Sequence, residues 1–147
     1  MARPIENIPK RLSQVADEEQ AFIEEKLLMP TTEPIAALPQ VAPHIAQIIR
    51  DFVRETKHAF REQVIAEYLF GSYSTDTQTP ESDIDILIIV KEYSPELQWQ
   101  LSGLASDYAL AYGVCISPIL KDIEVWQKNQ HYQTLFYQNI LRYGIPL

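Results

Sequence analysis

The sequence predicts a small α/β (α+β) domain in which helices pack on a mixed β-sheet. Short apolar runs rich in β-branched residues alternate with longer segments of helical periodicity, in the order helix, strand, strand, helix, strand, helix. The chain has 147 residues, the size of one domain with a single core. Hydrophobic residues make up 46% and charged residues 22%, which is typical of a globular protein and excludes a largely disordered one.

The first 42 residues differ in character from the rest. The stretch "DEEQAFIEEKLL" from Asp17 predicts a short helix that ends by Pro30, because acidic residues follow a plausible N-cap and apolar residues recur. Residues 29–43 carry four prolines, which predicts an extended connector. We therefore expect an N-terminal helical and extended arm over residues 1–42 and a globular domain over residues 43–147.

The globular part begins with a helix and continues with two strands. Apolar residues at helical spacing predict a helix over residues 43–63, whose apolar stripe we assign to the core. "VIAEYLF" (64–70) is β-rich and ends at Gly71, and "IDILIIV" (84–90) is apolar throughout, as in a strand covered on both faces. These two strands are expected to be neighbours in the sheet.

Three further elements complete the expected fold. Ser94 and Pro95 are a good helix start and Gly113 a good helix end, which predicts a helix between them. "VCISPIL" (114–120) predicts a third strand, and Pro118 favours an edge position or a strand end. The remaining segment predicts one helix from near Asp122 to Gly144.

The charge balance limits the partners of the protein. A net charge of −8 argues against nonspecific binding of nucleic acid and suits a basic partner. The chain contains no apolar run long enough to span a membrane and no apolar N-terminal signal, so we expect no membrane contact and a cytoplasmic location. Cys115 is the only cysteine, and the three histidines lie far apart, so neither residue type predicts a zinc site.

The stretch "LFGSYSTDTQTPESDIDILIIV" carries the chemistry. Gly71 allows a sharp turn and close approach of the backbone to a ligand, and Ser72 supplies a hydroxyl and an amide that can hold phosphate. Asp83 and Asp85 are two residues apart, so in a strand both side chains lie on one face. Two adjacent carboxylates repel, and Mg²⁺ relieves that repulsion while it binds substrate phosphates. The pattern predicts a site for phosphoryl or nucleotidyl transfer.

A simpler interpretation applies to the aspartates taken alone. Asp-x-Asp is common where strands start, and Asp83 could cap a solvated turn while Asp85 accepts local backbone hydrogen bonds. Gly71-Ser72 after one strand, ten intervening residues and an apolar run after Asp85 favour the functional interpretation.

Gly-Ser, ten residues and Asp-x-Asp together resemble the signature of the nucleotidyltransferase superfamily that includes DNA polymerase beta. The element order and short chain are most similar to its minimal members, the MntA-like antitoxins, over residues 43–147. The resemblance implies a nucleotidyltransferase fold that uses ATP and Mg²⁺. Asp83 and Asp85 would be the catalytic metal ligands, and the Gly71-Ser72 turn would hold the triphosphate.

The same resemblance implies a partner. MntA-like antitoxins transfer AMP to a tyrosine of a HEPN-type ribonuclease toxin, and this is the function we expect. Two alternatives stay open: a degenerate member that inhibits a partner only by binding, and a transferase that modifies a small molecule such as an antibiotic.

This sequence departs from the family pattern at two places. Many relatives continue Gly-Ser-x with Ala-Arg-Gly, whereas this chain has Ser74, Thr75 and Asp76. The third carboxylate of the family would fall at Cys115, and a thiolate is a soft, poor ligand for Mg²⁺. Asp107, Asp122 and Glu124 are possible substitutes, although a helix-surface or capping role is the simpler interpretation of each.

Overall fold

A computed structural model describes residues 38–147 of the chain. These residues belong to one compact unit, Ile35–Leu147. The helix expected after Asp17 and most of the proline-rich connector lie outside the described residues. The division into an arm of residues 1–42 and a domain of residues 43–147 therefore stays a prediction.

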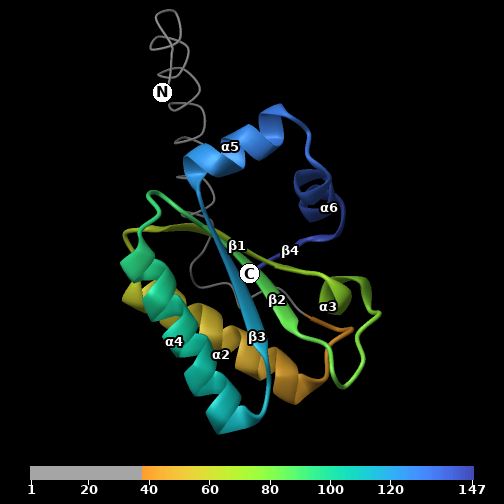
Figure 1. Cartoon of the computed structure of the whole chain (residues 1–147). Coiled ribbons are helices and arrows are strands. Elements are labelled where there is room, and N and C mark those ends of the chain that lie inside the picture. Colours follow the sequence, from red (N-terminus) through yellow and green to blue (C-terminus); the bar gives the residue numbers. More distant parts are fainter. Residues whose placement is uncertain (1–37) are drawn as a thin grey trace, which may run out of the picture. The chain divides into compact units, whose positions relative to one another are not determined.

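A four-stranded mixed sheet forms the centre of the domain, in the order β3-β2-β1-β4 (Figure 1). Its strands are β1 (Val64–Phe70), β2 (Ile84–Val90), β3 (Ile116–Asp122) and β4 (Ile145–Pro146). β1 pairs antiparallel with both β2 and β4, whereas β2 and β3 run parallel. The prediction that β1 and β2 are neighbours is confirmed. Pro118 lies in β3, an edge strand of the sheet, where a missing N–H is tolerated.

Two long helices, α2 (Pro43–Ala59) and α4 (Pro95–Tyr112), lie on one face of the sheet (Figure 1). Alternate residues of β2 point toward them, and Ile84, Ile86, Ile88 and Val90 are all almost completely buried in the core. Ser94 caps α4 by accepting a hydrogen bond from Leu97 N at 3.1 Å, and Gly113 ends the helix in the left-handed conformation. Both predicted ends of α4 are therefore confirmed.

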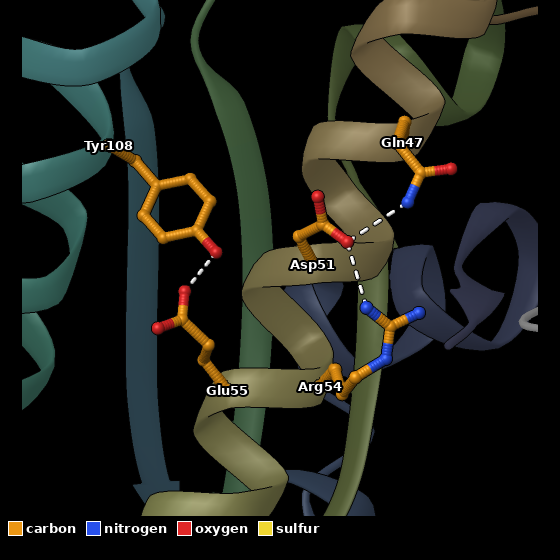
Figure 2. Close-up of polar contacts among 5 residues, drawn as sticks. All are labelled: Gln47, Asp51, Arg54, Glu55 and Tyr108. Atoms are coloured by element: carbon orange, nitrogen blue, oxygen red, sulfur yellow. Dashed lines mark hydrogen bonds and ion pairs between the residues drawn. The ribbon is translucent and has the colours of Figure 1, made fainter.

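Figure 2 shows a polar link between these two helices. The hydroxyl of Tyr108 on α4 donates a hydrogen bond to the Glu55 carboxylate on α2. On the same helix as Glu55, Asp51 accepts hydrogen bonds from Gln47 at 2.9 Å and from Arg54 at 2.8 Å. The Tyr108 ring also packs edge-on against Phe52, so burial and a hydrogen bond both fix α4 on α2.

Three shorter helices complete the domain: α3 (Ser72–Thr75), α5 (Ile123–His131) and α6 (Leu135–Tyr143). In Figure 1, α5 and α6 lie near the end of β3, and α3 follows β1 directly. The Phe136 ring of α6 meets the Phe70 ring of β1 edge-on with the ring centroids 5.5 Å apart, and the Trp126 ring of α5 is tilted against Tyr137 of α6 with the ring centroids 5.2 Å apart. No helix in the described part of the chain is long and apolar enough to cross a membrane.

Three details differ from the elements expected from the sequence. α2 ends at Ala59 rather than near residue 63, because Phe60 caps it and Gln63 N bonds back to Phe60 O. The last predicted helix is wrong as a single helix: Gln133 adopts φ 51°, and Thr134 starts α6 by accepting a hydrogen bond from Tyr137 N. The two-residue strand β4 was not predicted, because its sequence has no pattern that is typical of a strand.

Candidate active site

Gly71 ends β1 and brings the chain against Asp85. Its φ is 74°, a left-handed value that favours glycine. A Cβ atom placed on Gly71 would overlap Oδ2 of Asp85. Phe70, the residue before it, is the register partner of Asp85 across β1 and β2. The glycine of the motif is therefore needed twice, for its backbone angle and for the space that the Asp85 carboxylate occupies.

Asp83 and Asp85 stand at the start of β2. Asp85 belongs to the set of β2 residues that alternates with Ile84 and Ile86, so its side chain lies on the face away from α2 and α4. Burial raises the pKa of the Asp85 carboxyl, and the nearby Asp83 carboxylate raises it further. Asp83 is exposed and lies just before the strand. The two carboxylates are thus close enough to repel, as the sequence pattern predicts.

The turn after Gly71 is held by its own hydroxyl groups. Ser74 Oγ donates to Gly71 O at 2.9 Å, and Thr75 Oγ1 approaches the same carbonyl at 3.3 Å. Asp76 ends α3 in the left-handed conformation. The residues that replace Ala-Arg-Gly in this chain therefore stabilise the turn, and Ser72 stands at its start beside the Gly71–Asp85 contact.

Cys115 lies beside Asp83, at the position where the sequence placed the third carboxylate of the family. Its carbonyl accepts a hydrogen bond from Ile84 N at 2.8 Å. The pKa of its thiol is raised, first because the thiol is hydrogen-bonded to the Asp83 carboxylate, and then by burial and by the charges of both aspartates. A neutral thiol that donates to Asp83 does not supply a third oxygen ligand.

Ser117 is a residue that the sequence did not single out. It is the register partner of Asp85 in the parallel pair of β2 and β3, on the same face of the sheet. Its position could have been found from the alternation rule, since it stands two residues after Cys115. The Asp85 carboxylate therefore has a hydroxyl-bearing residue on one neighbouring strand and Phe70 on the other.

The other acids considered as third ligands have structural roles or lie exposed. Asp122 caps α5 by accepting a hydrogen bond from Val125 N at 2.8 Å. Glu124 forms an ion pair with Lys128 at 3.8 Å on the same helix. Asp107 is exposed on α4. Within residues 38–147, no group of three or more His, Cys, Asp or Glu side chains is arranged to hold a metal ion.

The Asp83–Asp85 pair nevertheless fits a hard divalent cation. Magnesium is commonly bound by one or two protein carboxylates, with the remaining positions filled by phosphate oxygens and water. The repulsion that raises the pKa of Asp85 is the kind that a bound cation relieves. The donor set is therefore sufficient for a cation that arrives with a nucleotide.

Comparison with known proteins decides the family. The family model described as "Nucleotidyltransferase domain" matches residues 47–142, which include the Gly71 turn and both aspartates. The chain belongs to the nucleotidyltransferase family. The resemblance inferred from Gly71-Ser72 and Asp83-x-Asp85 is thereby confirmed at the level of the family.

Curated relatives of this nucleotidyltransferase occur in Methanocaldococcus jannaschii. One, named "Putative protein adenylyltransferase MJ0141", is 32% identical over 104 residues, covering 70% of this chain and 98% of the relative. A second, "Putative protein adenylyltransferase MJ0604", is 33% identical over 96 residues, covering 65% of this chain and 90% of the relative.

Solved structures with similar chains include two toxin–antitoxin crystal structures. A mutant of the toxin–antitoxin MntA-HpeT aligns with a TM-score of 0.45 and 23% identity, over 68% of this chain and 69% of that chain. A toxin–antitoxin with AMP-PNP aligns with a TM-score of 0.46 and 21% identity, over 65% and 69% of the two chains.

Proposed function

We propose that this nucleotidyltransferase transfers AMP from ATP to a side-chain hydroxyl of a partner protein. The observation that supports this most directly is the fit of Gly71 against Asp85, which sets the turn and the two carboxylates side by side. Family membership supports nucleotidyl transfer, and the names of the two archaeal relatives support a protein as the acceptor.

In the proposed reaction each of these residues has a separate role. Asp83 and Asp85 would hold Mg²⁺, which neutralises charge on the phosphates and on the leaving pyrophosphate. The Gly71-Ser72 turn would hold the triphosphate, with the Ser72 hydroxyl as a hydrogen-bond donor to phosphate oxygen. The acceptor oxygen attacks the α-phosphorus, the bond to pyrophosphate breaks, and the hydroxyl proton passes to water.

The partner we propose is a HEPN-type ribonuclease toxin, modified on tyrosine and thereby neutralised. This follows from the motif's resemblance to the MntA-like antitoxins and from the acidic charge of −8, which suits a protein whose RNA-binding face is basic. A phosphate-bearing adduct near that face would block and repel the RNA backbone.

Mass spectrometry tests the reaction. The partner co-expressed with this protein and purified should be heavier by about 329 Da for each AMP joined to it covalently. Asp83→Asn with Asp85→Asn should abolish the mass increase, and Asp122→Asn, which alters a helix cap, is the matched control.

Stoichiometric inhibition is the second candidate function. The observation in its favour is that Cys115, not a carboxylate, lies beside Asp83. A partner that is fully inhibited but unmodified, with inhibition unchanged in the double asparagine variant, would establish this second function and overturn AMP transfer.

A further inference from the structure

The outer side of α4 carries an exposed stripe that has no packing role among the elements described in residues 38–147. Trp99, Gly103, Ser106 and Leu110 follow one another at intervals of four, three and four residues. At about 100° per residue these four positions share one side of a helix, directly opposite the buried residues Leu97, Leu101, Ala105 and Tyr108. Trp99 is 78% exposed and Leu110 is 89% exposed. We call these four residues the α4 stripe.

The spacing of the stripe is the spacing by which one helix packs on another. Intervals of four and three residues form the seam of a helix pair. Two large apolar residues stand at its ends, with small residues between them. A Cβ atom on Gly103 would meet nothing within 4 Å, so nothing in the described chain requires a glycine there. A helix laid between Trp99 and Leu110 would approach the α4 backbone closely at Gly103.

Charge identifies the partner that this stripe suits. Glu96 and Asp107 flank the stripe on the same side, and both are exposed. α4 contains no lysine or arginine. A helix bearing lysine or arginine next to its own apolar seam would therefore pair with this flank.

A second copy of this chain is a poorer occupant. Antiparallel pairing about a two-fold axis brings the same flank of both helices together, so Glu96 would face Asp107 of the other copy. In parallel pairing, the net charge of −8 on each copy would still repel.

The chain segment that follows α4, rather than the α4 stripe itself, reaches the candidate active site. α4 ends at Tyr112, and β3 follows it (Figure 1). Gly113 caps α4, and Cys115, between the two elements, lies beside Asp83. Leu110 is thus only five residues before the thiol that lies against the catalytic pair. The stripe is on the side of α4 away from the sheet, and Asp85 lies on the sheet face away from α4, so a helix seated on the α4 stripe would be separated from the aspartates by α4 and the sheet.

From these observations we infer that the α4 stripe docks a basic amphipathic helix of the protein that this enzyme modifies. The role as a substrate-docking surface rests on the proposed function, but the binding itself does not. It would let the enzyme select its substrate by a helix remote from the modified hydroxyl.

The test uses a defined probe and the full chain. The probe is a synthetic, fluorescein-labelled peptide designed as an amphipathic helix, with leucine and alanine along its apolar seam and lysine at its polar positions. The control peptide has glutamate in place of each lysine. Fluorescence anisotropy should show saturable binding of the lysine peptide and much weaker binding of the glutamate peptide. Trp99→Ala with Leu110→Ala should weaken binding at least about tenfold, as truncation of central anchors does.

Two sets of variants serve as controls. Leu135→Ala with Leu141→Ala removes apolar side chains that are 73% and 66% exposed on α6, and should leave binding unchanged. Glu96→Gln with Asp107→Asn should weaken binding and reduce its dependence on salt. Circular dichroism of each variant establishes that the fold is retained.

The inference would be overturned if the lysine peptide did not bind saturably or if both peptides bound equally. It would also be overturned if the α6 variant lost as much affinity for the lysine peptide as the Trp99→Ala, Leu110→Ala variant. A dimer in sedimentation that Leu110→Glu dissociates would assign the stripe to a second copy instead. Because binding is measured without nucleotide, and also in the Asp83→Asn, Asp85→Asn variant, docking and AMP transfer can fail independently.

Discussion

At Gly71 two constraints coincide, a left-handed φ of 74° and the Asp85 carboxylate in the space of a Cβ atom. Gly71→Ala should therefore displace Asp85 as well as strain the turn, and we expect nucleotide binding in calorimetry to fall at least about tenfold. The backbone strain alone is on the order of 1–3 kcal/mol.

Gly113→Ala separates these two effects. Gly113 has a similar φ of 68°, but a Cβ atom there would meet nothing within 4 Å. This variant should lose stability, by about 1–2 kcal/mol, and keep its nucleotide affinity. Equal affinities for the two alanine variants would show that the Asp85 contact is unimportant.

Glu67 is a buried acid on the opposite face of the sheet from the aspartates. Its Oε2 accepts a hydrogen bond from Thr56 Oγ1 at 2.8 Å, and Thr56 also donates to Val53 O at 2.9 Å, while Oε1 has no hydrogen-bond partner within residues 38–147. The single hydrogen of the Thr56 hydroxyl can satisfy only one of these two acceptors at a time, so the ionised Glu67 carboxylate has few hydrogen bonds. Consistently, the pKa of Glu67 is raised to about 7, chiefly by burial, although the hydrogen bond from Thr56 and the charge of Lys57 lower it.

The raised pKa of Glu67 predicts how stability depends on pH. Between the ordinary value of 4.5 and about 7, the folded state binds more protons than the unfolded state. The contribution of Glu67 to stability is therefore fully present below pH 4.5, declines as the pH rises through this window, and levels off above it. Glu67→Gln should remove this decline and stabilise the protein at pH 8 by roughly 3 kcal/mol, at 1.36 kcal/mol per pKa unit.

Chemical denaturation of both proteins at pH 5 and pH 8 would measure the effect. Glu62→Gln, at an exposed position nearby in sequence, is the control and should change neither value by much. If the free energy of unfolding changed between pH 5 and pH 8 by the same amount in the wild type, Glu67→Gln and Glu62→Gln, the role of Glu67 would be contradicted.

At the scale of elements, local signals predicted most of the fold. β1 and β2 were recognisable because apolar runs end at Gly71 and begin after Asp83, and α4 because Ser94, Pro95 and Gly113 mark its ends. The break between α5 and α6 was missed because it occurs at Gln133, a residue without the turn preference of glycine or proline. β4 was missed because its pairing with β1 is a tertiary contact without a local pattern.

The site was partly predictable for the same reasons. The alternation of side chains along a strand is enough to put Asp83 and Asp85 on one face. The approach of Gly71 to Asp85 depends on the register that places Phe70 opposite Asp85, and this register is a tertiary feature of the β1–β2 pair. Likewise, alternation from Cys115 puts Ser117 on the same face, but its pairing opposite Asp85 depends on the parallel register of β2 and β3, which the sequence does not specify.

Gly103 gives a prediction about α4 itself. It occupies a helix interior, where glycine is less favourable than alanine by about 0.5–1 kcal/mol, and a Cβ atom there meets nothing. Gly103→Ala should therefore raise the free energy of unfolding by about that amount in thermal or chemical denaturation. Gly144→Ala is the contrasting variant: its Cβ would lie 2.5 Å from Ile140 O, so it should destabilise the protein.

For the whole molecule, the Asp83–Asp85 pair opposes stability in the absence of a cation. Asp83 and burial both raise the pKa of Asp85, so keeping it ionised at neutral pH costs folding free energy. Asp83→Asn with Asp85→Asn should consequently raise the melting temperature of the metal-free protein. The charge that the proposed chemistry requires at Asp83 and Asp85 thus lowers the stability of the metal-free domain.

Magnesium should reverse the ranking of the two proteins. A ligand that binds only the folded state stabilises it by RT ln(1 + [L]/Kd), about 1.4 kcal/mol at ten times Kd. Thermal unfolding with increasing Mg²⁺ and a non-hydrolysable ATP analogue should raise the melting temperature of the wild-type protein and leave that of the double asparagine variant unchanged. Solutions with EDTA give the baseline, and equal shifts in both proteins would place the cation elsewhere. A wild-type shift with the analogue alone, undiminished by EDTA, would mean that nucleotide binding does not depend on the Asp83–Asp85 pair at all.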